Sequence, residues 1–270
     1  MPQLFELRDV SFDYEGIAAL RSLSLSIAQG ERLALLGANG SGKSTLLRLL
    51  DALCVPASGV IQFDGQALTP DRLQDDKFAL PFRRRVALVF QNPDVQLFNP
   101  TVFDEVAFAP LQLQWPRAEL LSRVAETMEW MGIAHLKDRP PYRLSGGEKK
   151  RVALASVFVL NPDVILLDEP TATLDPRSQS QVIDLIQHWK GSAKTVITAT
   201  HQLEIVADIA DRIVVLEEGR IAASGAVEEV LHDHELLLRA NLVHAHRHSH
   251  GSVTHSHPHM HSHEKHEHEH

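Results

Sequence analysis

The segment Gly37–Ser44, with the sequence GANGSGKS, constrains the fold of this chain more than any other feature. It follows a short apolar run, Arg32–Leu36, and precedes a helical pattern, Ser44–Leu53. Glycines at such a junction let several backbone N–H groups converge on an anion, and the helix N-terminus adds a partial positive charge. The motif G-x-x-x-x-G-K-[ST] in this setting therefore predicts a phosphate-binding loop.

Within this loop, we expect Lys43 to bridge the β- and γ-phosphates of a nucleoside triphosphate and Ser44 to ligate Mg²⁺. The alternative is a glycine-rich turn with a chance lysine, which the strand–loop–helix setting disfavours. The residues expected to line the phosphates are Gly37, Asn39, Gly40, Ser41, Gly42, Lys43, Ser44 and Thr45.

The rest of the chain alternates short strands with helices. Four short apolar runs have the composition of strands buried on both faces, as a parallel sheet requires. These runs are Arg32–Leu36, Val86–Phe90, Val164–Leu167 and Thr195–Thr198. Helical patterns follow most of them, namely Ser44–Leu53, Val102–Leu111, Arg117–Met131, Glu148–Leu160 and Gln179–Trp189. This alternation predicts an α/β fold with a mostly parallel core sheet.

Other segments predict additions to this core. Phe5–Tyr14 and Leu23–Ile27 alternate apolar and polar residues, which is typical of half-exposed antiparallel strands. Ile213–Leu216 and Arg220–Ser224 flank a Glu-Glu-Gly turn and predict a closing hairpin. We expect one α/β domain over residues 1–240, with an antiparallel β subdomain and an inserted helical subdomain at about 92–160.

Two adjacent carboxylates end one of the apolar runs, in the sequence VILLDE over Val164–Glu169. A carboxylate at the end of a buried strand is costly unless a cation meets it. Asp168 therefore fits a role in holding Mg²⁺, and Glu169 fits a general base that activates water. The alternative for such a pair, a helix cap or a solvated loop, is less favoured once the phosphate-binding loop lies upstream.

The segment Leu144–Lys149, LSGGEK, opens a further helical pattern. Phosphate loop, LSGG and acidic pair, in this order and spacing, resemble the ABC ATPase family over roughly residues 3–235. Other P-loop ATPases lack the LSGG element, so the joint match is specific. The resemblance implies a P-loop NTPase fold, hydrolysis of ATP with Mg²⁺, and coupling of hydrolysis to transport.

The resemblance also assigns roles to residues outside the three motifs. Tyr14 matches an aromatic that stacks on adenine, and Gln91 matches a glutamine that senses Mg²⁺ and faces the transmembrane partner. Asp175 matches the aspartate of the D-loop, and His201 matches a switch histidine that contacts the γ-phosphate. Each of these types, met alone, is more often a core or surface residue.

The signature residues Ser145, Gly146 and Gly147 form a second anion site at a helix N-terminus. In the family this site closes on the ATP held by a partner chain. Because each motif occurs once here, the resemblance implies a head-to-tail dimer with an identical or a paralogous ATPase. Two residues depart from the family pattern: Glu148 replaces the usual glutamine, and Thr173 occupies a D-loop position that is often small. Both departures bear on the detail of the contact between the two chains of the dimer, not on phosphate binding.

The extended segment Gln91–Phe98, QNPDVQLF, is similar to ATPases of energy-coupling-factor importers, which take up vitamins and transition-metal ions. This resemblance implies a transmembrane energy-coupling subunit, a substrate-binding membrane subunit, and a place at the cytoplasmic face of the membrane. A vitamin importer or an exporter stays an alternative. A soluble ABC protein for DNA or translation is disfavoured, since about 100 residues separate the motifs and one cassette is present.

The composition of the chain restricts the classes of partner that it can bind. The formal net charge of -9 offers no general attraction for nucleic acid, so no nucleic acid partner is expected. The single cysteine, Cys54, excludes an intrachain disulfide and fits a reducing compartment. Apolar runs reach four or five residues, whereas a bilayer-spanning helix needs about 20. Function at a membrane would therefore require docking to a spanning partner.

The C-terminal segment 244–270 carries 12 of the 17 histidines and almost no aliphatic residues, which predicts a disordered tail. Imidazole suits Ni²⁺, Co²⁺ and Zn²⁺, so we expect metal binding, nickel or cobalt in view of the importer resemblance. A solvated tail with incidental affinity, or an added metal-storage role, is the alternative. The candidate ligands are His244, His246, His248, His250, His255, His257, His259, His261, His263, His266, His268 and His270.

Overall fold

The computed structural model describes residues 2–172, 174–243, 245–250 and 253–258, with side chains for 2–172 and 174–243. Its centre is a six-stranded sheet in which all neighbouring pairs are parallel except β9–β10, so the predicted α/β fold with a mostly parallel sheet is confirmed. In spatial order its strands are β10 (Arg220–Ala226), β9 (Arg212–Glu217), β3 (Arg32–Leu36), β8 (Thr195–Thr200), β7 (Val164–Asp168) and β6 (Val86–Val89).

The central strands are buried along their whole length, as their apolar composition predicts. Because β3, β6, β7 and β8 run parallel, their carboxyl ends meet at one edge of the sheet. The register pairs Leu36 with Thr200 and Asp168 with Ala199. The segments that follow these strands therefore converge, and this edge is where open α/β sheets place their ligands.

A second, antiparallel sheet lies beside the core, in the order β2 (Ile17–Ala28), β1 (Gln3–Tyr14), β4 (Ser58–Phe63) and β5 (Gln66–Ala67). One hydrophobic cluster joins this sheet to the core sheet through helix α1 (Lys43–Leu50). Two helices that the sequence pattern did not predict, α2 (Pro70–Gln74) and α3 (Asp76–Arg85), follow β5. Phe82 of α3 is buried in the same cluster.

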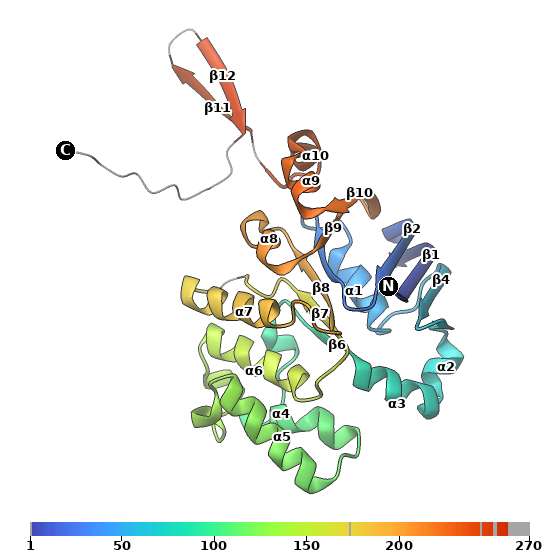
Figure 1. Cartoon of the computed structure of the whole chain (residues 1–270), viewed down its shortest axis with the longest axis vertical. Helices are drawn as coiled ribbons and strands as arrows, with labels where there is room; N and C mark the ends of the chain where they lie inside the picture. The colour runs from blue at the N-terminus through green and yellow to red at the C-terminus, as the bar shows by residue number, and fades with distance from the viewer. Residues whose placement is uncertain (1, 173, 244, 251–252, 259–270) are drawn as a thin grey trace, which may run out of the picture.

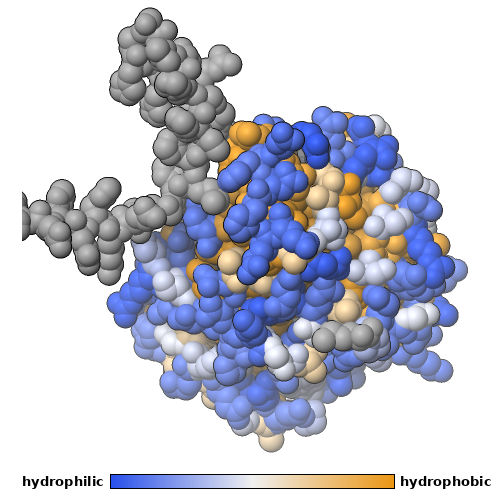
Figure 2. All heavy atoms as spheres, turned by 45° about the horizontal axis from the view of Figure 1, so that its top comes forward, coloured by the Kyte–Doolittle hydropathy of each residue, from blue (hydrophilic) through white to orange (hydrophobic). Residues whose placement is uncertain are grey.

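The opposite face of the core sheet packs on a second cluster. Its helices are α7 (Pro176–His188), η4 (Leu203–Ile205), α8 (Val206–Ile209), α9 (Val227–His232) and α10 (His234–Arg239). Figure 2 shows one face of the molecule, mostly hydrophilic with smaller hydrophobic areas. Within the described residues, no helix combines the length and apolar character that crossing a bilayer requires.

The segment between β6 and β7 is helical and has a hydrophobic cluster of its own. Its elements are η1 (Pro93–Val95), α4 (Val102–Gln112), α5 (Arg117–Trp130), η2 (Ala134–Leu136), η3 (Pro141–Arg143) and α6 (Gly146–Phe158). Figure 1 shows α4, α5 and α6 gathered at the end of the molecule away from α9 and α10. Helix α6 contributes to two clusters, because Leu154 packs with the core sheet and Val152 with the helical segment.

The described part of the C-terminal segment consists of two short strands. Strands β11 (Ala245–His250) and β12 (Val253–Pro258) pair as an antiparallel hairpin. Alternation of histidine with other residues has the period of a strand, which is the physical basis for this pairing. An isolated two-stranded hairpin is at best marginally stable in water. Residues 244, 251–252 and 259–270 lie outside the described residues.

An ion pair joins the start of β3 to the start of β9. The Arg32 guanidinium, 2% exposed, donates to both carboxylate oxygens of Asp211, at 2.5 and 3.2 Å. Its hydrogen bonds hold the pKa of Asp211 below the usual value. A depressed carboxyl pKa stabilises the fold above pH of about 4, and that contribution is lost as the pH falls through the folded-state pKa.

We expect Asp211→Ala to lower the free energy of unfolding by about 1–3 kcal/mol at pH 7, because Arg32 is left buried without its carboxylate. The half-exposed position of Asp211 keeps this value at the low end for buried pairs. Urea denaturation at pH 7 and at about pH 2 measures the effect, which should shrink at the lower pH because the carboxyl group then becomes protonated in the folded state. Asp138→Ala, at an exposed site without an ion pair in the described part, is the control. An equal loss at both pH values would contradict the assignment.

Candidate active site

The loop between β3 and α1 requires glycine at two positions. A Cβ atom on Gly37 would lie 2.4 Å from the Leu216 carbonyl oxygen and from Ser41 Oγ. Gly42, the N-cap of α1, has φ of 106°, and a Cβ atom there would lie 2.8 Å from the Ala19 carbonyl oxygen. Any larger residue would force the loop open, so the glycines are needed for its tight, concave path.

The loop holds polar groups poised for an anion. Lys43 is 6% exposed, and its ammonium donates to the carbonyl oxygens of Gly37 and Ala38, at 2.7 and 3.2 Å. Burial lowers the pKa of Lys43, whereas the charges of the acidic pair act in the opposite direction. Ser41 Oγ is buried and has no hydrogen-bond partner among the described residues. A buried ammonium and an unpaired hydroxyl fit the phosphates of a nucleotide.

The remaining loop residues complete this surface. Asn39 and Gly40 are exposed at the tip, and Thr45 is buried behind Ser44 in the first turn of α1. Ser44 Oγ donates to Asp168 Oδ1 at 3.0 Å, which joins the loop to the end of β7. These two neighbouring oxygens are the ligand type that Mg²⁺ prefers, so the residues present fit a magnesium nucleotide.

The acidic pair is buried at the end of β7. Burial raises the pKa of Asp168, and the hydrogen bond from Ser44 opposes that rise. Glu169 is 4% exposed and has φ of 44°, so the chain turns sharply after Asp168. The backbone N–H of Glu169 donates to the Ala199 carbonyl oxygen at 2.9 Å, which fixes this turn against β8.

The last residue of β8, Thr200, and the residue that follows it, His201, hold the Glu169 carboxylate. Thr200 Oγ1 donates to Glu169 Oε2 at 3.2 Å, and His201 Nδ1 lies 2.8 Å from Glu169 Oε1. His201 is half exposed, so its imidazole reaches from solvent to the buried carboxylate. The carboxylate is thereby oriented at the edge of the sheet, as a general base requires.

Within the described residues, Gln91 and Tyr14 form no hydrogen bond with the acidic pair. Gln91 is exposed just after β6, the strand beside β7. Tyr14, 40% exposed, ends β1, and its hydroxyl accepts a hydrogen bond from Arg48 of α1 at 3.1 Å. An exposed ring tied to the helix that starts in the loop is compatible with stacking on a base.

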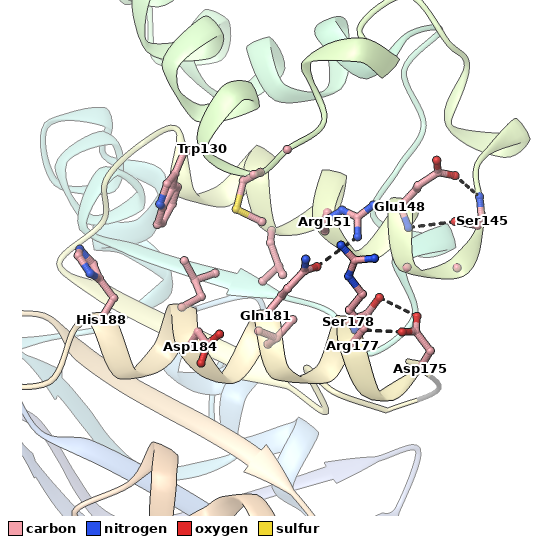
Figure 3. A pocket seen from close by; sticks show the side chains of 17 residues that line it. Trp130, Ser145, Glu148, Arg151, Asp175, Arg177, Ser178, Gln181, Asp184 and His188 are labelled. Atoms are coloured by element: carbon pink, nitrogen blue, oxygen red, sulfur yellow. Dashed lines mark hydrogen bonds between the residues drawn. The ribbon is translucent and has the colours of Figure 1, made fainter.

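The signature residues lie in a separate groove of about 1000 Å³, between α6 and α7. Figure 3 shows Ser145 and Glu148 joined by reciprocal hydrogen bonds, with Asp175 and Ser178 facing them from α7. Ser145 thus caps α6 with a capping box, and this explains why the helix begins at Gly146, two residues earlier than predicted. Glu148 serves this cap in place of the usual glutamine.

Asp175 caps the neighbouring helix α7. It accepts hydrogen bonds from the Ser178 hydroxyl at 2.7 Å and from the Ser178 backbone, and these lower the pKa of Asp175. A Cβ atom on Gly147 would lie 3.1 Å from Ser178 Oγ, so the two helix starts lie close together. Thr173, a residue of the same loop, lies outside the described residues.

The structure therefore brings the predicted residues together in two groups. Lys43, Ser44, Asp168, Glu169 and His201 form one group at the carboxyl edge of the sheet. The signature residues and Asp175 line the groove, and no residue of the phosphate loop lines it. One chain thus carries two separated half-sites.

The chain matches the family model described as ABC transporter over residues 20–172, more than half of its length. The chain belongs to the ABC transporter family. As an ABC transporter ATPase it hydrolyses ATP to ADP and phosphate.

Relatives of this ABC ATPase include transporter subunits. It is 54% identical to a nickel import ATP-binding protein, NikO, of Rhodobacter capsulatus, over 90% of this chain and 97% of that protein. It is 42% identical to the energy-coupling factor transporter ATP-binding protein EcfA2 of Methanospirillum hungatei, over 90% of this chain and 60% of that protein.

Solved structures agree with this assignment. CbiO1 of Clostridium perfringens, described as part of the ABC transporter complex cbiONQ, matches with a TM-score of 0.74 and 37% identity, covering 90% of this chain and 96% of that one. The ATP-binding cassette MJ0796, described as a dimer in a post-hydrolysis state with ADP and Pi, matches with a TM-score of 0.74 and 26% identity, covering 83% of this chain and 99% of that one.

Several residues of the ABC ATPase site were not predicted from the sequence. Thr200 holds Glu169, and the fully buried Thr171 donates to Gln202 behind His201. Lys150 and Gln96 attach α6 to the end of β6. Lys150 lies in the charged segment GGEKKR at the start of α6, so nothing in the local pattern indicated that it is buried.

Proposed function

We propose that this chain powers the uptake of a transition-metal ion, nickel or cobalt, through ATP hydrolysis. The observation that carries the proposal is the 54% identity to a nickel import ATP-binding protein over nearly the whole of both chains. The histidine-rich C-terminus, with 12 histidines in 27 residues, supports it independently, because imidazole favours these ions over alkaline-earth ions.

The separated half-sites support a head-to-tail dimer, with the chain itself or a paralogous ATPase as partner. In such a dimer the Ser145–Gly147 end of α6 faces the nucleotide held by the other chain's phosphate loop. The dimeric MJ0796 cassette, and the place of CbiO1 in the ABC transporter complex cbiONQ, support this assembly and a membrane partner. We place the chain at the cytoplasmic face of the membrane, bound to an energy-coupling subunit and a substrate-binding subunit.

In the proposed mechanism, Lys43 and the N-terminus of α1 bind the phosphates of ATP. Glu169, held by Thr200 and His201, accepts a proton from the water that attacks the γ-phosphate. Lys43, His201 and the opposing signature helix stabilise charge on the transferred phosphoryl group. Mg²⁺, held by Ser44, Asp168 and Gln91, neutralises charge on the phosphates when it is bound.

Hydrolysis then alters the assembly. The γ-phosphate is the group that both chains contact, so its removal weakens the dimer. The helical segment beside Gln91 passes this motion to the membrane partner. Tyr14 stacks on the adenine and fixes the nucleotide's orientation.

Uptake measurements distinguish nickel or cobalt import from the alternative, a vitamin importer with an incidental tail. A strain that lacks this chain should lose accumulation of radioactive nickel or cobalt, and the wild-type chain should restore it. The matched control is the Glu169→Gln chain, which should assemble without restoring uptake. Normal metal uptake in the deletion strain, together with loss of vitamin uptake, would favour the alternative.

We further propose that the histidine-rich tail buffers the transported ion. The hairpin register pairs His246 with His257 and His248 with His255, so these four positions share one face. Cross-strand neighbours have Cβ atoms about 5 Å apart, a spacing compatible with shared metal ligation. The other candidate ligands, apart from His250, lie outside the described residues. Within the described residues, no group of three or more potential metal ligands is clustered.

We expect titration calorimetry with Ni²⁺ or Co²⁺ to show several weak sites in the full chain at pH 7.5 and none in a chain ending at residue 243. Binding should fall as the pH drops through about 6.5, because protonated imidazole does not ligate metal. ATP hydrolysis should be equal in both chains, which makes it the internal control. Equal metal binding by both chains would exclude the tail as the site.

A further inference from the structure

Lys150 lies on α6, four residues into the helix that the signature opens, at the point where this helix meets the end of β6. We propose that Lys150 is a positioning residue, which makes the placement of Gln91 and the charge balance of the acidic pair depend on the docking of α6. This inference rests on the proposed roles of Gln91 and Glu169 in hydrolysis.

The first observation is the burial of the Lys150 ammonium. The residue is 2% exposed, and Nζ donates to the carbonyl oxygens of Phe90 at 3.1 Å and Gln91 at 3.3 Å. Lys150 forms no ion pair within the described residues. A buried ammonium without a carboxylate is costly, so its retention at this place indicates a specific task.

The second observation is the electrostatic link to the acidic pair. Burial lowers the pKa of Lys150 to about 8, and the charges of Asp168 and Glu169 oppose that shift. The same two carboxylates act on Lys43. The Lys150 ammonium therefore interacts electrostatically with the acidic pair, as the Lys43 ammonium of the phosphate loop does.

The third observation is a second tie between α6 and the same backbone. Gln96 Oε1 accepts the Phe90 N–H at 3.1 Å, and Gln96 Nε2 donates to the Ala153 carbonyl oxygen at 2.8 Å and to Ser156 Oγ at 3.0 Å. Both Phe90 polar groups are thus fastened to α6, the N–H through Gln96 and the carbonyl through Lys150. This is where the chain leaves the core sheet for the helical segment.

A shift of α6 against the sheet must therefore either break these bonds or carry Phe90 and Gln91 along. The same shift would remove a positive charge from the surroundings of Asp168 and Glu169. Helix α6 begins at the signature, which in the proposed dimer contacts the nucleotide bound by the partner chain. The position of the signature is therefore linked to the acidic pair of its own chain, which acts on the other nucleotide. Lys150 makes this connection through its hydrogen bonds to the backbone and through its positive charge.

The test replaces Lys150 by Met, which keeps the length and apolar stem but removes the ammonium. We expect kcat for ATP hydrolysis to fall by about tenfold, because misplaced catalytic groups lose rate. KM for ATP should stay within about twofold, because the phosphate loop is untouched, and half-maximal activity should need several-fold more Mg²⁺. Lys150→Arg should restore most of the rate, since guanidinium also donates to two carbonyl groups.

The matched control is Lys137→Met, a lysine that is exposed and forms no ion pair within the described residues. Its kcat should stay within about twofold of wild type, because substitutions at exposed positions without specific contacts have small effects. Hydrolysis by Lys150→Met at the wild-type rate would overturn the inference. So would a parallel rise in KM with no rescue by Arg, which indicates a role in folding alone.

A further comparison separates this inference from the proposed site. Should Glu169→Gln remain active, the proposed hydrolytic site itself fails. Should Glu169→Gln be inactive while Lys150→Met is wild type, only the role of Lys150 fails. In a chain carrying both Glu169→Gln and Lys150→Met, ATP should still trap the dimer, because the two nucleotide-binding half-sites are intact. Loss of that dimer would assign Lys150 to dimer formation and contradict the inference.

Discussion

Glu169→Gln should reduce ATP hydrolysis by a factor of about 10²–10⁴, the range for loss of a general base. The amide keeps the size of the side chain and still accepts a hydrogen bond from Thr200, so the surroundings are preserved. It has no carboxylate to accept the proton of the attacking water. Release of phosphate at saturating Mg-ATP measures the effect.

The same variant should accumulate as an ATP-bound dimer, because the γ-phosphate that joins the two chains is no longer removed. Size-exclusion chromatography with and without Mg-ATP detects this dimer. Glu119→Gln, the same change at an exposed position of α5, is the control and should behave as wild type in both assays. Unchanged phosphate release by Glu169→Gln would refute the assigned base, and a monomer with Mg-ATP would refute the shared site.

Lys43→Met should weaken ATP binding by about 100-fold and abolish hydrolysis at moderate ATP concentrations. The ammonium is buried, and a charge-assisted hydrogen bond to a phosphate contributes about 1.5–3 kcal/mol. Ser145→Arg should also be inactive, for a different reason, because a long cation at the capping position obstructs the second anion site. Fluorescent-nucleotide binding separates the two variants, since Ser145→Arg should bind ATP normally.

A mixture of these two inactive variants should regain hydrolysis. Random pairing makes half of the dimers mixed, and a mixed dimer has one intact and one doubly impaired site, so about a quarter of all sites are intact. Each variant alone, taken through the same mixing procedure, gives the baseline rate of hydrolysis. Absence of recovery after verified mixing would contradict a site built from two chains, and so would substantial hydrolysis by Ser145→Arg alone.

Much of the fold was predictable because its central strands are short, apolar and followed by helices. The phosphate loop was predictable because its glycines, lysine and serine are adjacent in sequence and act locally. Less of the structure was predictable where tertiary packing, rather than the local sequence pattern, determines whether an element forms. Helix α2, which begins at Pro70, is only five residues long, and the proline inside α3, Pro81, is unfavourable in a helix interior, so the sequence pattern did not indicate these helices. They form because Phe82 packs into the cluster between the sheets.

The separation into two groups of site residues was expected from the family resemblance, but its basis is tertiary. The signature and the phosphate loop lie about 100 residues apart in sequence, and no local sequence pattern predicts whether they are in contact in the folded chain. The groove between α6 and α7 arises because α6 packs on both the core sheet and the helical segment. Gln96 lies within the segment Gln91–Phe98 and Lys150 directly follows the signature, but neither pattern states their contacts, which arise through this packing.

The amino-acid sequence by itself determined the chemistry of this protein: an anion-binding loop, two carboxylates after a buried strand, and a histidine-rich end. These features depend on neighbouring residues, so their meaning is readable along the chain. Only the tertiary structure decided that Thr200 and His201 hold Glu169 and that Lys150 holds the backbone at Phe90 and Gln91. Those contacts exist because parallel strands bring distant segments to one edge of a sheet, a juxtaposition that no local pattern encodes.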